Sequence, residues 1–164
     1  MNLIGEIAQE NDMINAYHYH MGTMVQNLQE TDRLMEMTDP SLVYLLMDTG
    51  HAHYAGDDPN LIVQKYGLRI RNVHLKDIRQ EILDMVHLGK MSFLDSVKAG
   101  VFTVPGDGCI DFAPIFSTLS KKDYRGWFVV EAEQDPKKAN PFEYAKKGYS
   151  YLSKSIKDSG LIIE

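Results

Sequence analysis

Residues 42–51 read LVYLLMDTGH, and this stretch decides the fold class. Six apolar residues in succession have the length and character of a parallel strand that is buried on both faces. Asp48 follows them directly, and a carboxylate at such a place is costly to bury unless it is paired or bound to a metal. His51, three residues later, could be a second metal ligand or a proton-transfer group. A structural role for Asp48, as a helix cap or turn former, stays open as the alternative.

The same order of a short apolar run and a longer amphipathic segment recurs along the chain. Strands are predicted at 14–20, 42–47, 70–75 and 126–132. Helices are predicted at 2–11, 23–37, 58–66, 80–94 with an interruption at Gly89, 111–119 and 140–157. Thr23 is suited to cap the second of these helices. Strands that alternate with helices predict a parallel α/β sheet with right-handed crossovers.

Both a doubly wound sheet and a (β/α) barrel have this element order, and the positions of the polar residues distinguish them. Every predicted strand ends in side chains that bind metals or move protons: His18 and His20, Asp48 and His51, His74 and Lys76, and Glu131 and Glu133. Polar groups at the carboxyl tips of all strands are typical of the active face of a TIM barrel. A doubly wound sheet concentrates them at one switch point instead. The sequence has no G-x-G-x-x-G or P-loop motif, so nothing indicates dinucleotide or ATP binding.

The length of the chain conflicts with a complete barrel. It has 164 residues, whereas a full barrel takes about 250. We therefore expect residues 1–164 to be one domain, the C-terminal half of a (β/α)8 barrel with four βα units, strands 5 to 8. The strands that carry His18 and Glu131 would be open edges, which favour pairing with another chain. The apolar residues that we expect to be left half-covered are Val43, Leu45, Val73 and Val129. The chain should form a homodimer or require the N-terminal half.

Composition excludes several classes of protein. The 17 Lys and Arg residues against 23 Asp and Glu give a net charge of -6, which argues against a nucleic-acid partner because phosphates attract basic surfaces. No apolar run approaches the roughly 20 residues that span a bilayer, so we expect no membrane partner. The N-terminal residues lack the pattern of a signal peptide. With Cys109 as the one cysteine, an internal disulfide and a cysteine-cage zinc site are excluded, and a cytoplasmic location is expected.

The polar residues at the strand tips fit a metal site. His18 and His20 share one side of a strand because side chains alternate with a period of two. Imidazoles and carboxylates from neighbouring strand tips form a mixed N/O set that suits Mn²⁺, Co²⁺ or another divalent ion with open positions for substrate. Each residue alone has a structural alternative: the histidines could be satisfied or exposed, and Lys76 could pair with Asp77 or Glu131 instead of a substrate oxygen.

The motifs YHYHMGT, LMDTGHAHYAGDDP, VHLKD, PGDGCIDF and GWFVVEAEQDP occur in this order over nearly the whole chain. Together they resemble the xylose-isomerase-like TIM-barrel superfamily and, within it, the inosose (2-keto-myo-inositol) dehydratases of myo-inositol catabolism. The resemblance implies a divalent metal, usually cobalt or manganese, with zinc and magnesium as further possibilities. It assigns the metal ligands to His18, Asp48, His74 and Glu131. Many relatives carry Glu-Asn-His where this chain has His18-Tyr19-His20.

The resemblance also implies a reaction and a substrate class. A keto-cyclitol would lose an α-proton to a base, for which Glu131 and His51 are candidates, and then a β-hydroxyl protonated by Lys76 or His20. The implied substrate contacts are His20, His51, Lys76 and Glu133. An isomerase or epimerase of the same superfamily stays open as an alternative, as does a non-catalytic half barrel that binds metal or sugar. The net charge of -6 weighs against a related DNA endonuclease.

Overall fold

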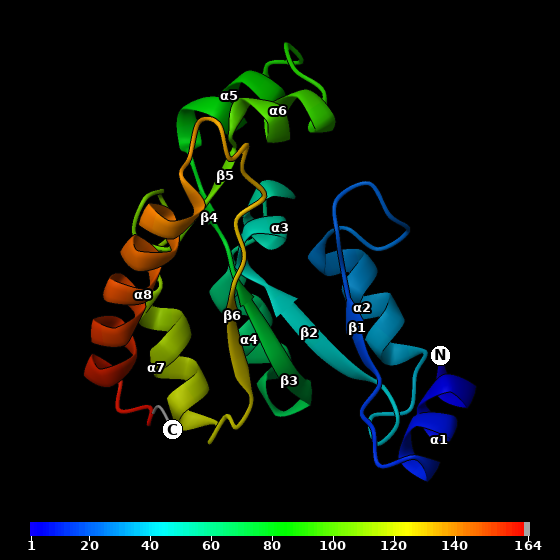
Figure 1. Ribbon diagram of the computed structural model, residues 1–164. Helices are drawn as coiled ribbons and strands as arrows, with labels where there is room; N and C mark the ends of the chain where they lie inside the picture. Colours follow the sequence, from blue (N-terminus) through cyan, green and yellow to red (C-terminus); the bar gives the residue numbers. More distant parts are fainter. Residues whose placement is uncertain (163–164) are drawn as a thin grey trace.

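The computed structural model describes residues 1–162 and has an α/β architecture (Figure 1). The strands are β1 (Ala16–His18), β2 (Tyr44–Asp48), β3 (Ile70–Leu75), β4 (Asp77–Ile78), β5 (Phe102–Thr103) and β6 (Trp127–Val130). The helices are α1 (Asn2–Glu10), α2 (Leu28–Glu36), α3 (Thr49–Tyr54), α4 (Pro59–Tyr66), α5 (Gln80–His87), α6 (Phe93–Ala99), α7 (Ala113–Lys121) and α8 (Pro141–Asp158), with a short 3-10 helix at Gly67–Arg69. None of the helices in this part of the chain is long and apolar enough to cross a membrane.

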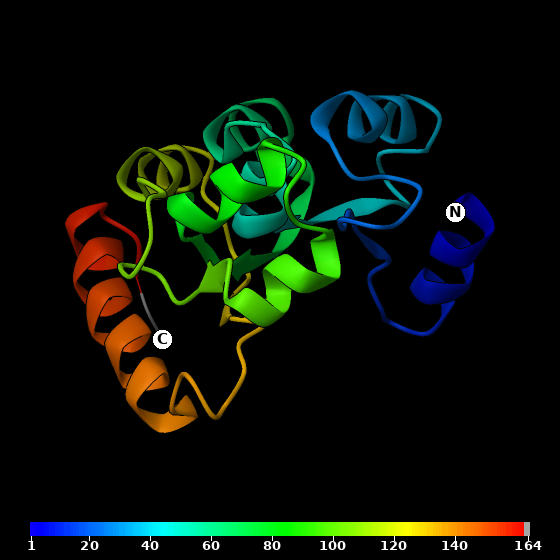
Figure 2. The same ribbon diagram turned by 90° about the horizontal axis from the view of Figure 1, so that it is seen from above.

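The main sheet has four parallel strands in the order β1-β2-β3-β6. This order confirms the predicted parallel sheet, and it makes β1 and β6 the edges of the sheet within residues 1–162. Figure 2 shows α2, α4, α7 and α8 in an arc on one side of the sheet. Because all four strands run in the same direction, their carboxyl ends lie at one edge of the sheet, as they do in a barrel.

The face of the sheet that meets the helices forms the core. Val43, Leu45 and Val73 are completely buried there, so the expectation that they would be half-covered is wrong. The reason is strand alternation, which directs these residues toward the helices. Val129, in contrast, is 38% exposed and Trp127, on the same face of β6, is 77% exposed. Trp127 and Val129 therefore leave apolar surface open on the opposite face of the sheet, at the edge strand β6.

Several element boundaries differ from the prediction. The second helix begins at Leu28 instead of near Thr23, because Asn27 forms a capping box with Glu30. The Thr23 hydroxyl instead donates to the carbonyl of His20 in the turn after β1. The helix α3 was not predicted, and neither was the small antiparallel pair β4–β5. The segment 80–94 contains α5 and the start of α6, which Figure 1 shows beyond the carboxyl ends of the parallel strands.

Candidate active site

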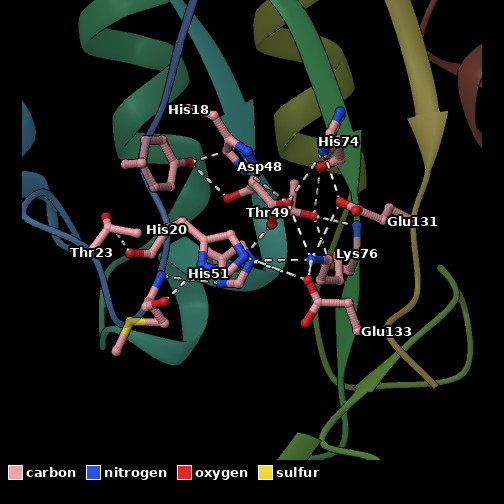
Figure 3. Close-up of polar contacts among 12 residues, drawn as sticks. His18, His20, Thr23, Asp48, Thr49, His51, His74, Lys76, Glu131 and Glu133 are labelled. Atoms are coloured by element: carbon pink, nitrogen blue, oxygen red, sulfur yellow. Dashed lines mark hydrogen bonds and ion pairs between the residues drawn. The ribbon is translucent and has the colours of Figure 1, made fainter. Parts of the chain in front are cut away.

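The residues expected at the strand tips converge at the carboxyl edge of the sheet (Figure 3). His18 ends β1, Asp48 ends β2, His74 lies near the end of β3, and Glu131 follows β6. Asp48 Oδ2 is 3.5 Å from His18 Nε2 and 3.7 Å from His74 Nδ1. His74 Nδ1 is also 2.8 Å from Glu131 Oε2. The four side chains proposed as ligands thus lie side by side, as parallel strands in this register require.

The two oxygens of Asp48 have different surroundings. Oδ1 accepts a hydrogen bond of 2.9 Å from the backbone N–H of His51 and caps α3. Oδ2 is buried without a hydrogen-bond partner among the described residues, and so is the neighbouring Nε2 of His18. Buried polar atoms are rarely left unpaired. The cap predicted as an alternative for Asp48 is therefore confirmed, and it leaves one oxygen available.

The donor set fits a divalent cation. The site contains three groups of possible metal ligands, and within each group the ligand atoms lie within 4.8 Å of one another. The groups are His18, Asp48 and His51; Asp48, His74 and Glu131; and His20, His51 and Glu133. The first two groups share Asp48. Although burial disfavours the charged form of Asp48, the imidazole of His18 and the ammonium of Lys76 outweigh it and lower its pKa to about 2. An ionised carboxylate beside imidazole nitrogens is a suitable ligand set for such a cation.

The second half of the site is organised around Lys76. Its side chain is completely buried, and Nζ lies 3.0 Å from Glu133 Oε1 and 3.1 Å from His51 Nε2. Nζ is also 3.4 Å from Glu131 Oε2 and 3.6 Å from Asp48 Oδ2. Desolvation opposes the ammonium, but these three carboxylates outweigh it and raise the pKa of Lys76. A cationic group therefore lies directly beside the proposed metal ligands.

Two histidines complete this half. The rings of His20 and His51 lie 3.7 Å apart, and His20 Nε2 is 3.6 Å from Glu133 Oε1. Burial lowers the pKa of His51, which favours its neutral form. Interactions with His51 and Lys76 lower the pKa of Glu133 below its ordinary value, in spite of partial burial. This half of the site therefore places a neutral imidazole, an ammonium and a carboxylate side by side.

Two aromatic rings, those of Phe102 and Phe93, form a wall beside Lys76 and His51. The ring of Phe102 is 4.8 Å from Lys76 Nζ and 5.0 Å from the His51 ring. Phe93, on α6, lies 6.3 Å from Phe102 and 6.5 Å from His51. Gly50 makes room for the lysine, because a Cβ there would lie 2.6 Å from Lys76 Cγ. The wall and the glycine are features that the strand-tip pattern could not predict.

Two nearby polar residues, His53 and Asp77, make their contacts outside this cluster. His53 lies with its Nε2 at 3.4 Å from Gln80 Oε1 and 3.5 Å from Cys109 Sγ. The Asp77 carboxylate accepts hydrogen bonds from backbone N–H groups, those of Ile78, Gly106, Gly108 and Ile110. It holds the loop after β5, and the alternative in which Asp77 pairs with Lys76 is wrong.

Sequence reasoning missed two hydroxyl groups in the site. The Tyr19 hydroxyl contacts the backbone of Asp48, and the Thr49 hydroxyl contacts the backbone of Lys76. Tyr19 alternates with His18 and His20 and so points toward the helices, where a tyrosine is expected to be a core residue. Its buried hydroxyl needs a partner, and that need is the one signal that could have drawn attention to it.

Comparison with known proteins places the chain in a class. The family model described as xylose isomerase-like TIM barrel matches residues 1–155, and the chain belongs to this family. Among curated proteins it is similar in sequence to inosose dehydratases. It is 56% identical over 152 residues to the inosose dehydratase of Clostridium tetani and 57% identical over 152 residues to that of Clostridium beijerinckii. Each match covers 93% of this chain and 51% of the relative, so the chain spans about half the length of these relatives.

Solved structures share the fold. The probable 3-DHS dehydratase AsbF from Bacillus anthracis superposes with a TM-score of 0.71 at 19% identity, over 93% of this chain and 54% of that one. The IOLI protein, solved with a binding zinc atom, gives a TM-score of 0.69 at 17% identity, over 94% of this chain and 52% of that one. At these identities the likeness shows a common α/β TIM-barrel fold.

Proposed function

We propose that this chain carries the metal and substrate site of a dehydratase that acts on a keto-cyclitol such as 2-keto-myo-inositol. One observation carries the proposal: the buried Oδ2 of Asp48, which accepts no hydrogen bond within the described residues, lies 3.6 Å from the buried ammonium of Lys76, in a chain 56% identical to an inosose dehydratase. An elimination from a ketone needs both a place for developing negative charge and a group that can protonate the departing hydroxyl. The half with the proposed metal ligands would stabilise the negative charge, and the half around Lys76 would supply the proton.

In this proposal His18, Asp48, His74 and Glu131 hold a divalent metal, Mn²⁺ or Co²⁺, with Zn²⁺ or Mg²⁺ as further candidates. When bound, the metal supplies a Lewis acid that stabilises negative charge on a carbonyl oxygen. Support comes from the mixed carboxylate and imidazole set and from the unpaired atoms of His18 and Asp48. The IOLI protein, which has the same fold, is described with bound zinc.

The remaining residues handle the substrate and its protons. His20, His51, Lys76 and Glu133 would contact the hydroxyl groups of the ring. His51, neutral and buried, or the carboxylate of Glu131 would accept the α-proton from carbon. The β-hydroxyl would then leave as water with a proton from Lys76 Nζ or His20, so that a carbon–carbon double bond forms and the enol rearranges to the diketone. The neighbouring carboxylates raise the pKa of Lys76, so Nζ holds the proton that this step requires.

We also propose that the four-stranded sheet acts as half of a barrel, the part with strands 5 to 8, and that a second polypeptide surface completes it. The exposed face of β6, with Trp127 and Val129, supports this idea, because a barrel interior is normally a packed core. The completing surface could be a second copy of this chain or a separate N-terminal half. Either arrangement would enclose the substrate beside the proposed metal ligands.

The test is a turnover assay of the purified chain with 2-keto-myo-inositol and added Mn²⁺ or Co²⁺, followed by proton NMR in deuterated water. We expect loss of substrate with formation of the dehydrated diketone, and no turnover after chelation with EDTA. The full-length inosose dehydratase of Clostridium tetani is the control for the assay. If that protein turns over and this chain does not, the proposal fails for this chain. Deuterium uptake with an unchanged number of hydroxyls would show an epimerase or isomerase instead.

A further inference from the structure

Two buried hydroxyls hold the strand tips that carry Asp48 and Lys76. The Tyr19 hydroxyl donates to the carbonyl of Asp48 at 2.7 Å and accepts from its N–H at 2.9 Å. The Thr49 hydroxyl donates to the carbonyl of Lys76 at 2.7 Å and accepts from its N–H at 2.9 Å. A hydroxyl has one donor and free acceptor lone pairs, so each side chain satisfies both backbone groups of one residue in the next strand.

The strand pairing explains why hydroxyls are needed at these two places. The ladder between β1 and β2 ends at His18 and Leu46, after which β1 turns away and the His20 N–H donates to Val25. The backbone groups of Asp48 on that side therefore have no strand partner. One strand further, β2 ends at Asp48 and the chain enters α3 at Thr49. The backbone of Lys76 would lose its partner in the same way, and the Thr49 side chain replaces it.

The two hydroxyls contact only the backbone of Asp48 and Lys76, and through the backbone they affect where the side chains of these residues lie. Asp48 and Lys76 are both completely buried, as is Thr49, and Tyr19 is 1% exposed. Water therefore does not reach these backbone groups when a hydroxyl is removed. The positions of Asp48 Oδ2 and Lys76 Nζ relative to each other depend on both strand tips. Figure 3 shows Thr49 between Asp48 and Lys76 at this point of the site.

We propose that Tyr19 and Thr49 are positioning residues: their hydroxyls fix the tips of β2 and β3 and thereby set where the Asp48 carboxylate and the Lys76 ammonium lie. The inference rests on the proposed function only for its consequence for metal binding. Partners that orient a metal ligand commonly change metal affinity by about 10–100-fold when they are removed. Tyr19 acts on a proposed ligand, whereas Thr49 acts on Lys76, so the two should differ in their effects on metal binding.

The experiment uses two matched pairs of variants in the whole chain. Tyr19→Phe removes one hydroxyl and keeps the ring, and Tyr17→Phe is its control, because the Tyr17 hydroxyl makes no hydrogen bond within the described residues. Thr49→Val removes the second hydroxyl at nearly constant volume, and Thr49→Ser restores it. Hydrogen exchange of single amides by NMR, without added metal, and calorimetric titration with Mn²⁺ are measured for each variant that folds by circular dichroism.

We expect amide exchange at Asp48 to become at least about 10-fold faster in Tyr19→Phe, and the Mn²⁺ dissociation constant to rise about 10–100-fold. Thr49→Val should speed exchange at Lys76 with a smaller effect on Mn²⁺ binding, and Thr49→Ser should restore protection. Exchange and Mn²⁺ affinity equal to those of Tyr17→Phe would overturn the role of Tyr19. If Tyr19→Phe does not fold, Thr49→Val and Thr49→Ser decide whether a hydroxyl holds a strand tip.

The outcomes for the two proposals can be separated. A wild-type chain that does not bind Mn²⁺ contradicts the proposed metal site. The exchange rates at Asp48 and Lys76 still decide whether the two hydroxyls hold the strand tips. Unchanged exchange in both Tyr19→Phe and Thr49→Val overturns the positioning role whether or not the wild type binds metal.

Discussion

His18 Nε2 and Asp48 Oδ2 lie 3.5 Å apart at the adjacent tips of β1 and β2, and each is buried without a hydrogen-bond partner in the described part of the chain. The other oxygen of Asp48 is already used to cap α3. Leaving such atoms without a hydrogen bond costs stability, which supports the proposal that the two residues bind a cation together.

His18→Ala and His20→Ala should have different consequences although they are two residues apart. His18→Ala removes a proposed ligand beside Asp48 and should weaken Mn²⁺ binding by at least about 100-fold. His20 faces Glu133 and His51, so His20→Ala should leave Mn²⁺ affinity within about threefold of wild type and reduce turnover. Calorimetric titration and the dehydratase assay measure the two effects. Equal losses of Mn²⁺ affinity in both variants would contradict the division of the site into two halves.

Lys76→Met should strengthen metal binding while it abolishes turnover. The ammonium lies 3.6 Å from Asp48 Oδ2 and 3.4 Å from Glu131 Oε2, where its charge opposes a divalent cation. We expect Mn²⁺ to bind about 10-fold tighter and turnover to fall by about 10²–10⁴-fold. Without metal, the uncompensated carboxylates should lower the free energy of unfolding by about 3–5 kcal/mol.

The control for Lys76→Met is Lys65→Met. Lys65 also pairs with an aspartate, at 2.7 Å from Asp32, but its side chain is 49% exposed. Lys65→Met should lower the free energy of unfolding by less than about 1 kcal/mol and should leave Mn²⁺ affinity unchanged. Chemical denaturation with and without Mn²⁺ measures both variants. The prediction for Lys76 is wrong if its methionine variant binds Mn²⁺ more weakly than wild type.

Gly50→Ala should destabilise the chain although Gly50 lies in a helix. Helix propensity alone favours alanine over glycine by about 1 kcal/mol. In this chain a Cβ at Gly50 would lie 2.6 Å from Lys76 Cγ and 2.8 Å from Lys76 Cβ, so the lysine must move. We expect a lower melting temperature and a loss of turnover of about 100-fold, as a displacement near 1 Å can cause.

A double-mutant cycle with Lys76→Ala tests the cause of this effect. Lys76→Ala removes the Cγ that meets the new methyl group, so the thermal destabilisation by Gly50→Ala should be smaller in that background. Additive effects on the melting temperature would show that the clash is not with Lys76.

Asp32→Asn should reduce the dependence of stability on acidic pH. Asp32 accepts a hydrogen bond from the Tyr66 hydroxyl at 2.5 Å and forms an ion pair with the Lys65 ammonium at 2.7 Å. Burial raises the pKa of Asp32, but these two partners outweigh it and the net pKa is lowered. A lowered pKa in the folded state adds stability above the unfolded value, about 3.9, and this stability is lost as the pH falls through the folded value.

The measurement is the free energy of unfolding in urea from pH 3 to pH 7. Asp32→Asn should be less stable than wild type by about 1 kcal/mol at pH 7, and the difference should start to shrink at about pH 4 and decrease further as the pH falls toward the lowered folded pKa. Glu10→Gln, an exposed carboxylate at the end of α1, is the control and should show no such trend. A difference that stays constant with pH would contradict the prediction.

Trp127 should report association of the chain. It is the one tryptophan, it is 77% exposed, and it shares an open face of the edge strand β6 with Val129. If a second copy covers this face, tryptophan emission should shift to shorter wavelength with rising protein concentration, and sedimentation velocity should show a dimer at low micromolar concentration. Val129→Lys should prevent both changes, because it places a charge in the contact.

Leu61→Lys is the control for this surface, because Leu61 is 49% exposed on α4, away from β6. It should leave the emission shift and the dimer unchanged. A concentration-independent monomer with an unshifted emission spectrum would contradict self-association and would favour a separate N-terminal half as the completing surface.

The sequence by itself determined the order of the four parallel strands and which side chains lie together at their carboxyl ends. The apolar run at 42–47 required a buried parallel strand, and polar residues at each strand tip required a common edge, since parallel strands end together. All eight residues expected at the site, including His18, Glu131 and Glu133, lie there. Their order along the chain carries this information, and no long-range contact is needed to extract it.

Tertiary structure alone decided how those residues share their contacts. That Asp48 uses one oxygen as a cap and leaves the other unpaired depends on α3, which propensity did not predict. That Lys76 lies among three carboxylates, beside a glycine that gives it room, depends on strand register and helix packing. The same packing buried Val43, Leu45 and Val73. Local sequence specifies which side chains are present, but distances between strands are set by the packing of the whole core.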